Sequence, residues 1–245
     1  MAAKRLERLG ALLILGLVSA GLAGCASGAA APTPGAPPTQ AQAVSFAHAV
    51  NLQPSDIPGI LESAPEAENE RNRPLDRELA LCVGSAAPDN AVASVHSATF
   101  RYAPEGRFVQ LQSRVEVQPD ARVASLDYEA IVRRRGFNCL ARYLPASIEK
   151  HDGSGYDYGA LNITRLPTPL PGIPKSFGFR LTTSITSPGI PQPVPLYADE
   201  RGLVSGPAEI MLTAVAAPEP LANETEQRLM QLLSQRAQQH KLSSP

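Results

Sequence analysis

Two segments in which apolar and polar residues alternate one by one constrain the fold of this chain more than any other feature. Residues 109–118 and 177–186 each carry a regular polar row, which is Gln110, Gln112, Arg114 and Glu116 in the first and Arg180, Thr182, Ser184 and Thr186 in the second. A period of two places successive side chains on opposite faces of a β-strand. Each segment is therefore predicted to be a strand with one buried face and one wet or lightly covered face.

The remaining segments extend this pattern to a whole domain. Further strands are predicted in residues 44–52, 92–102, 158–166, 195–204 and 208–216, and a Pro-Gly turn at 103–106 joins two of the strands as a β-hairpin. Apolar stripes at helical spacing predict helices in residues 74–82, 120–135, 137–144 and 218–237. A run of strands bracketed by helices, without strand–helix–strand alternation, indicates an α+β domain. We expect a mainly antiparallel sheet of about six to seven strands packed with about three to four helices.

The N-terminus carries an export signal that ends at a cysteine. A positively charged start precedes the uncharged apolar run 11–20, which is too short to span a bilayer, since a spanning helix needs roughly 20 residues. The junction Leu22-Ala23-Gly24-Cys25 resembles the lipobox of bacterial lipoproteins. That resemblance implies removal of residues 1–24 and a palmitate-bearing lipid anchor on Cys25, which holds the protein on the extracytoplasmic face of the cell membrane. The alternative is an ordinary secreted protein with a chance cysteine at this position.

The predicted organisation has three parts. They are a signal peptide in residues 1–24, a lipidated Cys25 with a disordered Pro- and Ala-rich tether in 25–43, and a single globular domain in 44–245. The whole chain has a formal net charge of −1. Because the leader is basic, the mature protein is expected to carry about −3, which provides no electrostatic footprint for nucleic acid. We therefore do not expect nucleic acid as a partner.

Two cysteines remain after Cys25. In an exported protein, an even pair such as Cys82 and Cys139 is most simply a disulfide, which would tie two predicted helices together on one side of the sheet. The alternative is a pair of buried free thiols. A zinc site is disfavoured because no histidine or further cysteine lies at ligand spacing. The sequence accordingly predicts no metal site and no cofactor.

No motif in the chain predicts a catalytic site. Residues 147–150 match the S-x-x-K pattern of penicillin-binding enzymes, but the companion S-D-N and K-T-G motifs are absent. The histidines are scattered along the chain and suggest no catalytic or metal cluster. We therefore expect a non-enzymatic binding or sensing module of the cell envelope rather than an enzyme. The alternative is an envelope hydrolase or transferase whose active site has no recognised motif.

The order of elements resembles a known family. A helix-borne cysteine before the first clear strand, a hairpin, a second cysteine in the next helix, a closing strand with Gly206-Pro207-Ala208-Glu209-Ile210 and a terminal amphipathic helix follow one another. This order is similar to the PsbP-like α/β fold of small actinobacterial lipoproteins and kinase sensor domains. The resemblance covers residues 44–240 and implies a binding or assembly role. It provides no catalytic residues to carry over.

The polar rows of the two alternating segments form the predicted binding face, which we assign to Gln110, Gln112, Arg114, Arg180 and Thr182. Amide, hydroxyl and guanidinium groups on rigid strands can hydrogen-bond a glycan, a peptide or a lipid headgroup at little ordering cost. The alternative is a hydrated sheet surface without a ligand, which antiparallel sheets commonly have. The expected partners are the lipid bilayer, through the N-terminal acyl anchor, and an envelope ligand or protein that the sequence does not identify.

Overall fold

The computed structural model describes residues 37–57, 59, 61–63, 73–84, 90–102, 107–150, 157–187, 192–240 and 242. The predicted signal peptide, Cys25 and most of the predicted tether lie outside these ranges. Within them, no helix is both long enough and apolar enough to cross a membrane.

The described strands form a single sheet. It has nine strands within the described ranges, along the path β1-β3-β4-β9-β8-β7-β5, with β2 paired to β4 and β6 paired to β7. Every pair of neighbouring strands is antiparallel. The strands are β1 (Leu61–Ser63), β2 (Ala93–His96), β3 (Thr99–Tyr102), β4 (Phe108–Val117), β5 (Asp157–Tyr158), β6 (Asn162–Arg165), β7 (Ser176–Thr186), β8 (Val194–Ser205) and β9 (Ala208–Ala217). The predicted α+β class and antiparallel sheet are confirmed, with more strands than the sequence indicated.

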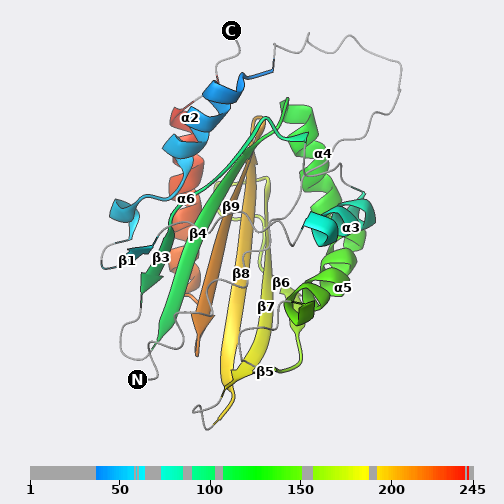
Figure 1. The fold of residues 1–245 in the computed structure, drawn as a ribbon. Helices are drawn as coiled ribbons and strands as arrows, with labels where there is room; N and C mark the ends of the chain where they lie inside the picture. The colour runs from blue at the N-terminus through cyan, green and yellow to red at the C-terminus, as the bar shows by residue number, and fades with distance from the viewer. Residues whose placement is uncertain are drawn as a thin grey trace.

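Helices cover both faces of this sheet (Figure 1). One face carries α2 (Gln40–Val50) and α6 (Asn223–Gln239), and the other carries α3 (Arg73–Val83), α4 (Ala121–Val132) and α5 (Arg134–Lys150). A short 3-10 helix, η2 (Pro54–Asp56), follows α2. Two hydrophobic cores result, one on each side of the sheet.

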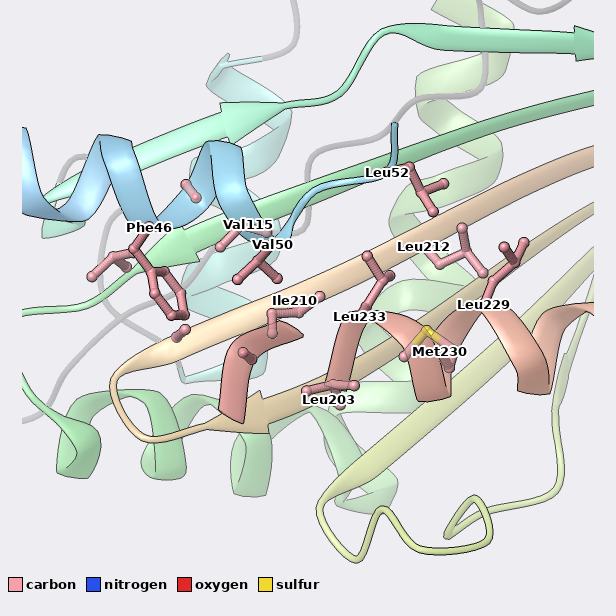
Figure 2. Packing of buried hydrophobic residues seen from close by; sticks show 14 of the residues in the cluster. Phe46, Val50, Leu52, Val115, Leu203, Ile210, Leu212, Leu229, Met230 and Leu233 are labelled. Atoms are coloured by element: carbon pink, nitrogen blue, oxygen red, sulfur yellow. The ribbon is translucent and has the colours of Figure 1, made fainter. Parts of the chain in front are cut away.

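The first core lies between the sheet and the helices α2 and α6. Figure 2 shows side chains of both helices converging on the strands, and its labelled residues are Phe46, Val50, Leu52, Val115, Leu203, Ile210, Leu212, Leu229, Met230 and Leu233. The apolar residues of α6 recur at the spacing of one helical face, which directs them to the sheet. Burying each large apolar side chain contributes roughly 1.5–3 kcal/mol.

The second core lies between the sheet and the helices α3, α4 and α5. Phe177 and Phe179 of β7 are at its centre, with ring centroids 5.7 Å apart, and Leu140 of α5 is fully buried beside them. Cys82 of α3 and Cys139 of α5 form a disulfide with a Cα–Cα distance of 5.8 Å. The predicted disulfide is therefore confirmed, and it joins two helices on one side of the sheet as expected.

The prediction of a strand in residues 44–52 is wrong, because this segment belongs to helix α2. Ala43, Phe46, Ala47 and Val50 are buried at helical spacing, and the alternation seen at 44–52 is a partial view of that stripe. Thr39 caps the helix through a capping box with Gln42, whose backbone N–H donates to the Thr39 hydroxyl at 3.3 Å. The helix begins at Gln40, inside the segment assigned to the tether and ahead of the predicted domain start at 44.

The helix predicted in residues 137–144 was expected to end at Pro145, and this prediction is also wrong. Helix α5 continues through Pro145 to Lys150. A proline removes one backbone N–H and distorts the turn before it, but neighbouring packing can carry a helix past it.

Candidate functional site

The two predicted polar rows lie on opposite faces of the sheet. The apolar row of β4 packs against α2 and α6, so Gln110, Gln112 and Arg114 point to the opposite side. The apolar row of β7 packs against α4 and α5, so Arg180 and Thr182 point to the α6 side. The five residues therefore do not form one binding face. Alternation separates two rows within a strand, but it does not say which row faces which layer.

The β4 row is largely internal. Gln110 and Gln112 are only 2% and 4% exposed, so the expectation of a wet row is wrong for this strand. The Gln112 amide nitrogen lies 3.4 Å from both the Ser97 carbonyl oxygen and the Thr99 hydroxyl oxygen. The Arg114 Nη2 atom lies 3.6 Å from Glu116 Oε2. These contacts describe a polar layer inside the protein.

Two titratable groups beside this layer have altered pKa values. Burial, with a further effect of the Arg114 charge, lowers the pKa of His96 to about 4. Burial raises the pKa of Glu200 to about 8, against the opposing effect of Arg114. Both groups are therefore held mainly in their neutral forms at neutral pH.

The β7 row, by contrast, reaches solvent. Arg180, Thr182 and Ser184 are partly exposed on β7. The register places Asn162 and Thr164 of β6 beside this row on one flank and Tyr197 of β8 on the other. We call the set the polar strip, and it consists of Asn162, Thr164, Arg180, Thr182, Ser184 and Tyr197. Only the pairing of strands distant in sequence brings its members together.

Arg180 is the best-positioned group of the polar strip. Its Nε and Nη2 donate to the two carboxylate oxygens of Asp199, at 2.6 and 2.5 Å. Asp199 is 2% exposed, whereas the Arg180 side chain is 21% exposed. The hydrogen bond to Asp199 is the main cause that raises the pKa of Arg180 above its usual value. The guanidinium is thus permanently charged, and the buried Asp199 carboxylate holds it in place while part of it remains in solvent.

A buried charge cluster lies behind Arg180 and anchors helix α6. Arg201 Nε donates to Glu226 of α6 at 2.9 Å, and the two side chains are 2% and 0% exposed. The Nη1 group of Arg201 donates to the Pro167 carbonyl at 3.0 Å. Position 178 needs a glycine here, because a Cβ atom would lie only 2.9 Å from Arg201 Cδ.

The carboxyl of Glu226 favours its protonated form. Burial is the main cause, and the neighbouring Asp199 adds to it by hydrogen bonding and by its charge. Together these effects raise the pKa of Glu226 to about 8, against the opposing influence of Arg201. Below that pH the Glu226 carboxyl is mainly neutral, so the hydrogen bond from Arg201 joins a guanidinium to an uncharged acid.

Glu200 and Glu226, whose pKa values are raised, line neither of two hollows in the described surface. One hollow of about 250 Å³ is lined by residues of α4, β6, β7 and the loop between β6 and β7. The other, of about 440 Å³, lies between α2 and the residues His240 and Leu242. Among the described residues, no group of three or more His, Cys, Asp or Glu side chains could hold a metal ion. The chemistry that the strip offers is hydrogen bonding from a fixed guanidinium, hydroxyl groups, an amide and an aromatic ring.

No protein-family model matches the chain, and no curated protein matches it. Among solved structures, the chain is similar to the extracellular domain of PknH from Mycobacterium tuberculosis, with 9% sequence identity and a TM-score of 0.38. The match covers 79% of this chain and 96% of that chain.

Proposed function

We propose that this protein is a lipid-anchored, non-enzymatic binding module on the extracytoplasmic face of a bacterial cell membrane, and that the polar strip is its binding surface. The observation that carries the proposal is the Arg180 guanidinium, which the buried Asp199 carboxylate fixes while its outer edge stays in solvent. A group held in this way meets a ligand with little further loss of side-chain freedom. Thr182 and Thr164 add hydroxyl groups on either side of it.

The proposed location is supported by the cysteines. Disulfides persist mainly outside the reducing cytoplasm, and the Cys82–Cys139 bridge supports an exported protein. The junction at Cys25 supports anchoring by lipid. The Cys82–Cys139 bridge joins α3, which precedes the predicted hairpin, to α5, which follows it. This arrangement supports the resemblance to PsbP-like domains of envelope lipoproteins.

Replacing the anchor residue is expected to release the protein. In a Cys25→Ser variant no thiol is available for the diacylglycerol thioether, so the protein should move from the membrane pellet to the medium or periplasm. Fractionation followed by immunoblotting measures this, with Ser27→Ala as a matched control that stays in the pellet. The anchoring proposal is wrong if Cys25→Ser stays membrane-bound and the wild type carries no acyl mass.

Cross-linking from the polar strip tests the binding role. A photo-cross-linking amino acid at Thr182 is expected to capture envelope material in intact cells, because this position lies beside Arg180 on the proposed surface. The same amino acid at Gln231, on the exposed side of α6, serves as a control and should capture none. Adding Arg180→Ala to the Thr182 probe should reduce the yield. Equal yields from Thr182 and Gln231 would place the binding surface elsewhere.

A further inference from the structure

We infer that the ligand of the polar strip is a neutral glycan of the cell envelope. This inference rests on the proposed function and names the ligand class of the same surface. Three properties of the strip carry it, namely its balanced charge, its supply of hydrogen-bonding groups and its position on the face of the sheet.

The strip carries no unbalanced charge among the described residues. Its one cation, Arg180, forms a two-pronged ion pair with Asp199, and the other members are amides, hydroxyls and a phenol. A surface for nucleic acid or for anionic lipid needs an excess of positive charge. A neutral, polar ligand matches this surface better than an anionic one.

The hydrogen-bonding groups of the strip suit a polyol. Among the residues that the structure describes, Arg180 donates only to Asp199, through its Nε–H and one Nη2–H, so its remaining N–H groups can donate to a ligand. The hydroxyl groups of Thr164 and Thr182 both donate and accept, as sugar hydroxyls do. Because the buried Asp199 fixes the plane of the guanidinium, its donors are directed before a ligand arrives.

An aromatic ring borders these donors. The Arg180 guanidinium lies over the Tyr197 ring, with its central carbon 5.8 Å from the ring centroid, so the ring supports the guanidinium as Asp199 does. Tyrosine combines an apolar ring face with a polar tip, and it contributes contact area at low cost in conformational freedom. Tyr197 therefore helps to hold the Arg180 donors in place for the hydroxyl groups of a sugar.

Arg180, Thr182 and Ser184 lie on β7 within the sheet, whereas Asn162 and Thr164 belong to β6, which pairs only with β7 among the described strands. β7 is hydrogen-bonded to β8 on one side and to β5 and β6 on the other, so its backbone groups along Arg180–Ile185 are engaged in pairing. A peptide that adds to a sheet as an extra strand needs free backbone groups at an edge. Recognition at Arg180 and Thr182 therefore goes through side chains, as a glycan requires.

Binding of defined oligosaccharides to the mature protein tests this inference. Titration calorimetry or NMR with neutral hexaoses of glucose, mannose, galactose and arabinose should show saturable binding to at least one of them. Binding to a neutral sugar should change little between low and high salt, because no ion pair is formed with the ligand. Hyaluronan hexaose and vesicles of phosphatidylglycerol with phosphatidylcholine serve as anionic probes and should bind no better than controls.

Variants of the strip complete the test. Arg180→Lys keeps the charge but loses the planar donors, and it should weaken binding by about tenfold or more. Tyr197→Leu should weaken it as well. Thr182→Val is isosteric and keeps the strand preference, so a loss of affinity in this variant does not come from misfolding. Arg142→Lys, at an exposed position on α5, is the matched control with unchanged affinity.

Each contrary outcome is decisive. The inference is overturned if no neutral hexaose binds, if binding is confined to the anionic probes and vanishes with salt, or if Arg180→Lys and Thr182→Val bind as the wild type does. If a probe at Thr182 captures a protein or a lipid in cells while the neutral sugars fail, the binding role stands and the glycan assignment alone is wrong. If neither occurs, both the proposed function and this inference fail.

Discussion

Replacing Cys82 and Cys139 with alanine is expected to lower the free energy of unfolding by about 4 kcal/mol. The disulfide closes a loop with a sequence separation of 57, and cross-linking a loop of that length removes much of the freedom of the unfolded chain. The bridge also ties α3 to α5, next to the buried residues Leu79 and Leu140. Urea unfolding of the wild type and the double variant measures the difference.

Two comparisons separate the cross-link from packing. Wild-type protein with the disulfide reduced should show nearly the same loss as the double alanine variant, because Cys139 is small and its packing contribution is minor beside the cross-link. Arg135→Ala removes only a hydrogen bond at 2.8 Å to the Cys82 carbonyl from an exposed side chain, and it should cost far less. A loss below about 1 kcal/mol in the double variant would show that the bridge does not constrain the unfolded chain as expected.

At about pH 9, where Glu226 is mainly ionised in the folded wild type, replacing Arg201 with methionine is expected to lower the free energy of unfolding by about 3–5 kcal/mol. Arg201 is 2% exposed, and its removal deprives the buried Glu226 of its guanidinium partner and the Pro167 carbonyl of its donor. Methionine fills most of the volume, so the loss comes from the unpaired polar groups and not from a cavity. Arg142→Met, at an exposed position, is the matched control and should change stability by less than about 0.5 kcal/mol. A similarly small change in Arg201→Met would contradict a stabilising role for the cluster.

Glu226 makes the stability of this cluster depend on pH. Its folded-state pKa of about 8 lies above the usual value of 4.5 for an exposed glutamate, so between these pH values the folded protein holds a proton that the unfolded chain has released. The resulting stabilisation is fully present below pH 4.5 and is lost as the pH rises through about 8. In Arg201→Met the destabilisation should therefore grow with pH, because the Glu226 carboxylate formed at high pH has no guanidinium beside it.

Glu226→Gln is the companion variant for this pH dependence. It mimics the protonated acid, so it should be close to the wild type at about pH 4 and increasingly more stable than the wild type as the pH rises to about 9. Thermal unfolding of both proteins at the two pH values gives the comparison. A constant difference between them would show that Glu226 does not titrate in this range.

The sequence by itself determined the features that depend on local pattern and on residue chemistry. The alternation in 109–118 and 177–186 identified β4 and β7, and the even cysteine pair outside the leader identified the Cys82–Cys139 bridge. Alternation with a period of two follows from the pleat of a single strand, so it is visible in a short segment. An even pair of cysteines in an exported protein forms a disulfide because the compartment is oxidising. In residues 44–52 the alternation is misleading, because the buried helical stripe includes Ala43 and Ala47, whose small side chains give only a weak apolar signal.

Only the tertiary structure decided which row of each strand meets solvent and which groups surround Arg180. The polar rows of β4 and β7 look alike in sequence, yet the helices that pack on opposite faces bury one and leave the other partly exposed. Asp199 and Glu226, which fix Arg180 and Arg201, come from β8 and α6, and strand register and helix docking place them there. Such contacts join residues far apart in the chain, and local propensity carries no information about them.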